Sequence, residues 1–120
     1  GFAPSSYMIR ELIPALAENY HVIAPDLPSF CFTESPGSDE YVYTFDNLAK
    51  TIDRFTEQLK LLRYAIIVLD YGAPVGCRLA TAHQVVFTAI ISQIGIAYEE
   101  CLALGWDEIR RYWQSPTSDI

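Results

Sequence analysis

The stretch from Ile66 to Gly76 constrains the fold more than any other part of this 120-residue chain. Residues 66–69 form an unbroken apolar run, which is typical of a strand that is buried on both faces of a sheet. The run stops at Asp70, and Gly72 follows before a segment that favours a helix. A carboxylate at the end of a buried strand, on a tight turn into a helix, lies where open α/β sheets bind their ligands.

The rest of the chain alternates between segments typical of helices and segments typical of strands. Pro14 is expected to kink or shorten the first helix. Thr44 is expected to cap the clearest amphipathic helix, and the last turn of that helix is expected to hold Lys60 and Arg63. Strands that alternate with helices indicate parallel βαβ units, so the predicted class is α/β, a three-layer sandwich with a mostly parallel sheet. The sequence predicts helices over 7–18, 45–62 and 77–82, strands over 20–24, 64–69 and 87–92, a long loop over 29–43, and two short helices between 98 and 113.

Composition and charge exclude several classes of protein. The chain is 51% hydrophobic with a net charge of −7, and it has no cluster of basic residues beyond Arg110 and Arg111, so we expect a folded domain that does not bind nucleic acid. No apolar run reaches the roughly 18–20 residues of a membrane span, and the N-terminus lacks the pattern of a secretory signal. The three cysteines suggest neither a disulfide framework nor a metal site. We therefore expect a cytoplasmic protein with no cofactor, no metal and no membrane partner.

Three segments, taken together and in collinear order, resemble the central part of an α/β-hydrolase from the branch that contains haloalkane dehalogenases and epoxide hydrolases. Residues 1–6, Gly-Phe-Ala-Pro-Ser-Ser, resemble the end of the loop that supplies an oxyanion-hole amide in that branch. Residues 21–31 resemble its Val-Ile-Ala-Pro-Asp-Leu-Pro-Gly-Phe-Gly segment. Residues 68–72, Val-Leu-Asp-Tyr-Gly, match the aspartate version of the nucleophile elbow, with Val68 and Gly72 as the small positions.

The resemblance implies a two-step hydrolysis. Asp70 attacks an electrophilic carbon of a small apolar substrate, an epoxide or an alkyl halide, and forms an ester that a histidine-activated water then hydrolyses. The backbone N–H groups of Tyr71 and Phe2 stabilise the oxyanion or the leaving group. An aspartate suits this chemistry because a carboxylate is already a nucleophile at neutral pH, whereas a serine needs a base to activate it.

The sequence also departs from the pattern of that branch. Tyr71 stands where a tryptophan usually helps to bind halide, and Ser29 and Cys31 stand where the family has glycines. Neither His21 nor His83 matches the catalytic histidine, which the family takes, with its second acid, from later strands. In the family's sheet, a further strand lies between the strands that correspond to residues 20–24 and 64–69. In the family sequence, that strand comes before the position at which this chain begins. We therefore expect a larger chain, strand pairing with another copy as a homo-oligomer, or a changed strand order.

Several alternatives stay open from the sequence. Asp70 has a second interpretation as the cap of the following helix, and Asp26 is interpreted as a turn former rather than a catalytic acid. Residues 1–97 are expected to form the partial hydrolase core, and residues 98–120 the start of a helical cap or C-terminal helices. The alternative function is a non-catalytic module that self-associates through unpaired strand edges; a nucleotide-binding fold is disfavoured by the glycine spacing. The aromatic residues expected to line a substrate pocket, or else to form an exposed patch, are Tyr98, Trp106, Tyr112 and Trp113.

Overall fold

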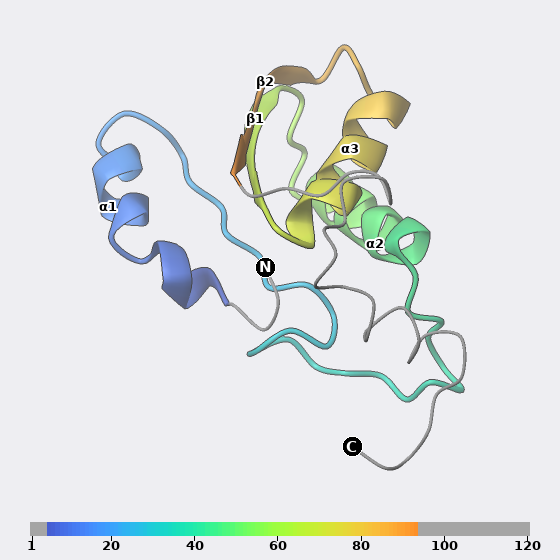
Figure 1. The fold of residues 1–120 in the computed structure, drawn as a ribbon. Coiled ribbons are helices and arrows are strands. Elements are labelled where there is room, and N and C mark those ends of the chain that lie inside the picture. Colours follow the sequence, from blue (N-terminus) through green and yellow to red (C-terminus); the bar gives the residue numbers. More distant parts are fainter. Residues whose placement is uncertain (1–4, 94–120) are drawn as a thin grey trace, which may run out of the picture.

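The computed structural model describes residues 5–93, which form a two-stranded parallel sheet with helices on both sides (Figure 1). The predicted crossover between two parallel strands is confirmed, because α3 connects β1 to β2. The elements in chain order are the 3₁₀ helix η1 (Ser6–Ile9), α1 (Leu12–Ala17), α2 (Phe45–Gln58), β1 (Tyr64–Leu69), α3 (Gly72–Ala82) and β2 (Phe87–Gln93).

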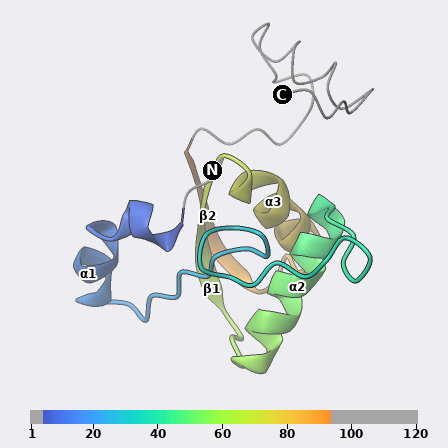
Figure 2. The same ribbon diagram turned by 90° about the horizontal axis from the view of Figure 1, so that it is seen from below.

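The described sheet separates the helices into two layers. Figure 2 shows α1 on one side of β1 and β2, with α2 and α3 together on the other side. The strands pair in register, with Ile66 opposite Ile90 and Ile67 opposite Ile91. This helix–sheet–helix order confirms the predicted α/β three-layer class, here as part of a larger architecture.

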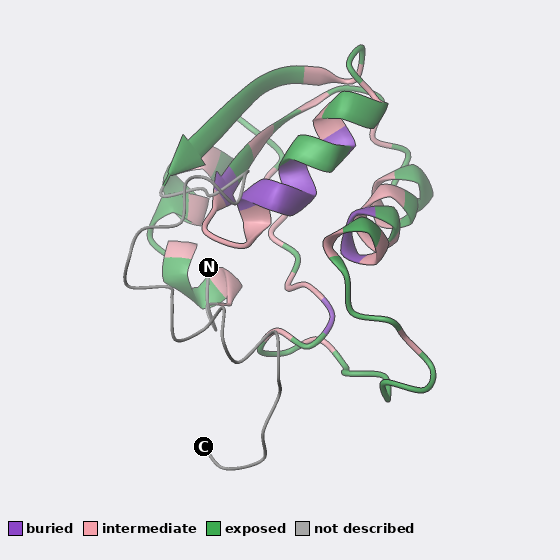
Figure 3. Cartoon of the chain, turned by 45° about the vertical axis from the view of Figure 1, so that its right-hand side comes forward, coloured by how far each residue is buried: buried purple, intermediate pink, exposed green. Residues whose placement is uncertain are grey.

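The core lies between α2 and α3, next to the inner face of β1. Figure 3 shows buried residues on both of these helices. Val68, on the face of β1 that meets α3, is only 7% exposed. The central cluster consists of Leu48, Ala49, Val75 and Leu79, and the partly buried side chains of Leu27, Tyr41, Phe45, Ile52 and Phe87 pack against it.

Helix α2 begins where the sequence predicts and ends earlier. The Asn47 N–H donates to Thr44 Oγ1 over 3.2 Å, so the predicted N-cap is confirmed. The helix stops at Gln58 because Lys60 adopts a left-handed φ of 55°, and the Leu61 N–H donates to the Thr56 carbonyl over 3.0 Å. This is the Schellman arrangement, which satisfies carbonyls at a helix end. The prediction that Lys60 and Arg63 occupy the last turn is therefore wrong.

Pro14 does not kink a long first helix, because the predicted helix over 7–18 is divided into η1 and α1. Helix α1 begins at Leu12, so Pro14 is its third residue. The first backbone N–H groups of a helix have no partner within the helix, and a proline there loses no hydrogen bond. Pro14, which was expected to interrupt a helix, instead lies in the first turn of the short helix α1.

The strand predicted over residues 20–24 is not formed. Residues 21–27 carry no strand assignment, and β1 and β2 are the two strands among residues 5–93. An extended segment becomes a strand only when a neighbour completes its ladder of hydrogen bonds, and β1 pairs with β2 rather than with this segment. The hydrophobic pattern of residues 20–24 is typical of a strand, but a segment forms a strand only if another segment pairs with it.

Within the described residues, one face of the sheet is exposed, and the face toward α3 is buried on β1 but not on β2, where Ile90 is 47% exposed. Ile67 on β1 is 40% exposed and its neighbour Ile91 on β2 is 55% exposed. Helix α3 packs against the opposite face of β1 and α2 packs against α3, while α1 contributes no buried residue. The prediction that both faces of these strands are buried is therefore wrong for the described residues.

Candidate active site at the end of strand β1

Asp70 occupies a strained turn between β1 and α3. Its φ is 45°, in the left-handed region that non-glycine residues rarely adopt. The Ala73 N–H donates to the Asp70 carbonyl over 3.0 Å and closes the turn. Such a turn costs about 1–2 kcal/mol in an L-residue, and it is characteristic of a nucleophile elbow, which presents a side chain above the end of a strand.

Asp70 directly precedes the N-cap of α3. The N-cap of α3 is Tyr71, one residue later, and this position makes no side-chain capping hydrogen bond. Asp70 therefore lies outside the helix, at the junction that an elbow requires.

Gly76 allows α3 to approach β1 closely. A Cβ atom at Gly76 would lie 2.5 Å from Val68 Cγ1 and 3.1 Å from Ile66 Cδ1. A Cβ atom at Gly72 would lie 4.0 Å from Val68 Cβ, which is an ordinary contact. The close approach of α3 to β1 therefore requires a glycine at position 76, which sequence reasoning did not identify. A helical glycine four residues after the elbow glycine was the available signal.

Tyr71 points toward the start of α2. Its ring centroid lies 5.8 Å from that of Phe45. Burial raises the pKa of the Tyr71 phenol above its ordinary value, and the negative charge of Asp70 raises it further. The phenol is protonated at neutral pH, as an ordinary tyrosine is, and can donate a hydrogen bond.

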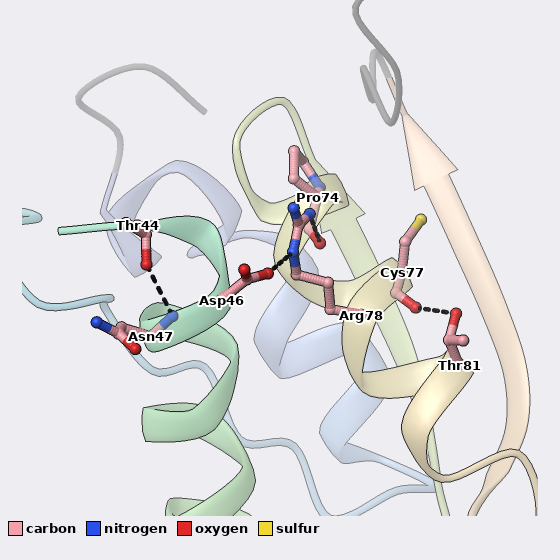
Figure 4. A network of polar contacts seen from close by, with 7 residues as sticks. All are labelled: Thr44, Asp46, Asn47, Pro74, Cys77, Arg78 and Thr81. Atoms are coloured by element: carbon pink, nitrogen blue, oxygen red, sulfur yellow. Dashed lines mark hydrogen bonds and ion pairs between the residues drawn. The ribbon is translucent and has the colours of Figure 1, made fainter. Parts of the chain in front are cut away.

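Arg78 joins α3 to the first turn of α2. Its Nε donates to Asp46 Oδ1 over 2.5 Å and its Nη1 donates to the Pro74 carbonyl over 3.0 Å (Figure 4). Its guanidinium also lies 5.6 Å from the centroid of the Phe45 ring. The ion pair is substantially exposed, so it contributes about 1 kcal/mol or less to stability. Its importance is geometric, because it holds the helix that begins at the elbow.

Neither histidine is arranged to serve Asp70 as a base. His83 follows the last residue of α3 and its Nε2 lies 2.9 Å from Asp53 Oδ1. Because α3 has 11 residues and is therefore about 16 Å long, His83 is at the opposite end of the helix from Asp70. His21 is exposed in the extended segment after α1.

The segment from Asp26 to Thr33 forms a compact turn. The Phe30 N–H donates to the Leu27 carbonyl over 2.8 Å, and Thr33 Oγ1 donates to the Asp26 carbonyl over 2.6 Å. Ser29 and Cys31 have φ values of 69° and 43°. These two residues stand where the resembling family has glycines, and the backbone keeps the conformation for which glycine is suited.

Replacing Ser29 and Cys31 together with glycine is expected to stabilise the protein. Each substitution relieves left-handed strain and loses no buried side chain, because both residues are exposed. After the entropy cost of glycine, we expect a gain of about 0.5–1 kcal/mol per site, measured by urea unfolding. Ser35→Gly in the same loop, where φ is not positive, is the matched control and should give no gain. An equal gain at Ser35 would contradict the explanation.

Several predicted site residues lie outside the residues that the structure describes. These are Phe2, Tyr98, Trp106, Tyr112 and Trp113, together with the predicted boundary between residues 97 and 98. Within residues 5–93, no group of three or more histidine, cysteine or acidic side chains is arranged to hold a metal ion. No helix in that same region has the length and hydropathy needed to cross a membrane.

Comparison with known proteins shows the family of this chain. Residues 1–112 match the sequence model of the alpha/beta hydrolase fold. The chain belongs to the α/β hydrolase family. This hydrolase-family chain is 45% identical over 120 residues to YNR064C, an uncharacterized hydrolase of Saccharomyces cerevisiae, and the match covers 99% of the chain and 41% of the relative. It is 32% identical over 75 residues to haloalkane dehalogenase 2 of Mycobacterium tuberculosis, covering 62% of the chain and 26% of that enzyme.

Solved structures show the same fold. The hydrolase-family chain superimposes on Cfl2 of Burkholderia cenocepacia with a TM-score of 0.74 and 23% identity, covering 95% of the chain and 39% of that structure. It superimposes on a meta-cleavage product hydrolase of Pseudomonas fluorescens with a TM-score of 0.65 and 27% identity, covering 72% of the chain and 31% of that structure. The chain thus spans less than half the length of each of these relatives.

Proposed function

We propose that this chain carries the nucleophile of a hydrolase that acts on a small apolar electrophile, an epoxide or an alkyl halide. The observation that carries the proposal is the left-handed Asp70, at the end of β1 and immediately before α3. This is the position in which the family presents a nucleophile, and an aspartate there suits attack on carbon.

The first chemical step needs only Asp70 and a donor for the leaving group. One carboxylate oxygen of Asp70 attacks the electrophilic carbon and forms a carbon–oxygen bond. The carbon–oxygen bond of the epoxide, or the carbon–halogen bond of the alkyl halide, breaks, and its electron pair leaves with the oxygen or halogen. The Tyr71 N–H, together with that of Phe2, is proposed to stabilise the developing negative charge.

The second step regenerates the carboxylate. Water attacks the ester carbonyl after a base removes its proton, and the alcohol leaves. We assign no residue of this chain as that base, because His83 lies at the far end of α3, where its Nε2 is 2.9 Å from Asp53 Oδ1. The base and its supporting acid are therefore proposed to come from other parts of a complete hydrolase.

Tyr71 favours a leaving atom that accepts a hydrogen bond from oxygen. The phenol is protonated at neutral pH, and both burial and the charge of Asp70 raise its pKa further. An epoxide oxygen becomes an alkoxide when the ring opens, and a neutral O–H is a good donor to an alkoxide. The similarity to a haloalkane dehalogenase supports the alkyl halide equally, so both substrate classes belong in the test.

Covalent labelling tests the proposal. Because the base acts only in the second step, the 120-residue protein should accumulate the ester when it is incubated with styrene oxide or with 1-bromobutane. The mass should rise by that of the whole epoxide or of the butyl group, and peptide mapping should place it on Asp70. Hydroxylamine should remove an Asp70 ester but not a thioether on the exposed Cys31 or Cys77. Labelling confined to cysteine would contradict the proposal.

A second candidate function is a non-catalytic module that self-associates through the sheet. The exposed Ile67 and Ile91 lie side by side on the sheet face opposite α3, and residues 21–27 join no ladder within the described part of the chain. Apolar surface of this kind favours association with a second copy. A defined oligomer in sedimentation velocity experiments, combined with no labelling of Asp70, would favour the module over the enzyme.

A further inference from the structure

We propose that Arg78 is a positioning residue that holds the Tyr71 side chain in place through the ring of Phe45. The Arg78 guanidinium lies 5.6 Å from the centroid of the Phe45 ring, which is within the range of a cation–π contact. The centroid of the Phe45 ring lies 5.8 Å from that of the Tyr71 ring. The Phe45 ring thus contacts both side chains, and Tyr71 directly follows Asp70 in the chain.

The Arg78 guanidinium is itself restrained by hydrogen bonds to two helices. Its Nε donates to Asp46 Oδ1 on α2 over 2.5 Å, and its Nη1 donates to the Pro74 carbonyl on α3 over 3.0 Å (Figure 4). A planar guanidinium can make both hydrogen bonds at once, whereas a lysine ammonium is a point charge on a flexible chain. Arginine at position 78 therefore holds a restrained cationic group over the Phe45 ring.

The two aromatic rings are only partly buried, so the neighbours that they do have matter for their orientation. Phe45 is the first residue of α2 and packs against the core cluster, and Tyr71 is the N-cap residue of α3. Burial is the main cause of the raised pKa of the Tyr71 phenol, so this pKa reports how closely other side chains cover the phenol. Releasing the Phe45 ring is therefore expected to expose Tyr71 and to lower its pKa.

The restraint on Tyr71 also affects substrate preference, and this part of the inference rests on the proposed function. The phenol is proposed to donate to the oxygen of an opening epoxide, which becomes a strongly basic alkoxide. Bromide is a weakly basic leaving group and gains less from such a donor. A donor that is displaced by about 1 Å loses much of its effect on the rate, so a loosened Tyr71 should slow attack on an epoxide more than attack on an alkyl halide.

The test compares Arg78→Met and Arg78→Lys with the original 120-residue protein. Methionine keeps an unbranched apolar side chain without charge, and lysine keeps the charge without the paired donors. We expect Arg78→Met to weaken the nuclear Overhauser effects between the Phe45 and Tyr71 rings by about twofold or more and to lower the pKa of Tyr71, both measured by NMR. Labelling of Asp70 by styrene oxide should slow about tenfold, while labelling by 1-bromobutane should stay within about threefold. Arg78→Lys should also lower the pKa of Tyr71, because charge alone does not hold the Phe45 ring.

Arg10→Met is the matched control. Arg10 follows η1, and its guanidinium lies 4.4 Å from the centroid of the Tyr7 ring, so the substitution removes the same kind of contact from another part of the fold. It should leave the contacts between the Phe45 and Tyr71 rings, the pKa of Tyr71 and both labelling rates unchanged. Equal changes in Arg10→Met and Arg78→Met would contradict a local role of Arg78.

The direction of the pKa change separates positioning from an effect of charge. If Arg78 acted on Tyr71 only through its positive charge, Arg78→Met would raise the pKa of Tyr71, because a nearby cation favours the phenolate. A raised or unchanged pKa in Arg78→Met, or an Arg78→Lys protein that matches the original, would overturn the positioning role. Equal slowing of the two labelling reactions would overturn the effect on substrate preference. If the original protein itself is not labelled, the proposed function fails, and the ring contacts and the pKa of Tyr71 still decide the role of Arg78.

Discussion

Asp70→Asn is expected to abolish covalent labelling at the end of β1 without disturbing the fold. The amide oxygen of asparagine is a very poor nucleophile, so the rate of ester formation from styrene oxide or 1-bromobutane should fall by about a thousandfold or more. Asparagine tolerates the left-handed backbone of residue 70 at least as well as aspartate does. The free energy of unfolding should therefore change by less than about 1 kcal/mol. Mass spectrometry gives the labelling rate and urea unfolding gives the stability.

The same variant reports on the environment of Tyr71. Burial is the main cause of the raised pKa of the phenol, and the Asp70 charge is the second. Asp70→Asn removes only that charge, so the pKa of Tyr71 should fall without returning to its ordinary value. NMR titration of ¹³C-labelled tyrosine checks this. An unchanged pKa, or labelling that persists in the variant, would show that residue 70 does not act as proposed.

Gly76→Ala is expected to be among the most destabilising single-methyl changes in the described part of the chain. The added Cβ would meet Val68 Cγ1 at 2.5 Å and Ile66 Cδ1 at 3.1 Å, and both atoms belong to the strand that leads to Asp70. Overpacking of this kind costs about 1–3 kcal/mol, and we expect a loss of about 2 kcal/mol after the helix-propensity gain of alanine. The melting temperature should fall by roughly 5–10 °C.

Gly72→Ala is the matched control for Gly76→Ala. It makes the same chemical change in the same helix, but its Cβ would lie 4.0 Å from Val68 Cβ, and we expect unchanged or slightly higher stability. Adding Val68→Ala to Gly76→Ala should restore part of the loss, because the smaller side chain makes room for the new methyl group. Equal effects at Gly72 and Gly76 would contradict the close approach of α3 to β1.

Features that depend on neighbouring residues were predictable from the sequence. An apolar run, an acidic residue and a glycine predicted the strand and the turn at Asp70, and Thr44 predicted the beginning of α2. In each case, local backbone preferences and side-chain caps act within a few residues. The start of α3 was predicted wrongly, because that helix was expected over 77–82 and begins five residues earlier, at Gly72. The family resemblance added the alignment of these pieces into an α/β hydrolase fold, which the comparisons confirm.

Features that depend on distant residues were not predictable in the same way. Whether residues 20–24 form a strand depends on which segment lies beside them, and the need for glycine at position 76 depends on how closely a helix approaches a strand. The bond from Ser6 to Asp26 spans 20 residues. Alternation and spacing contain no information about such distances, so these contacts emerge only when the tertiary structure is known.

The contacts of Tyr71 have a consequence for how the active site responds to changes elsewhere. The Tyr71 ring packs against the Phe45 ring. The Arg78 guanidinium lies over the Phe45 ring and also pairs with Asp46. Both Phe45 and Asp46 directly follow the long loop that ends at Thr44. A change in the conformation of that loop is therefore expected to act, through the Phe45 ring, on Tyr71, which adjoins the proposed nucleophile Asp70. Variation in the loop sequence is thus expected to change the surroundings of Asp70 while leaving the turn itself intact.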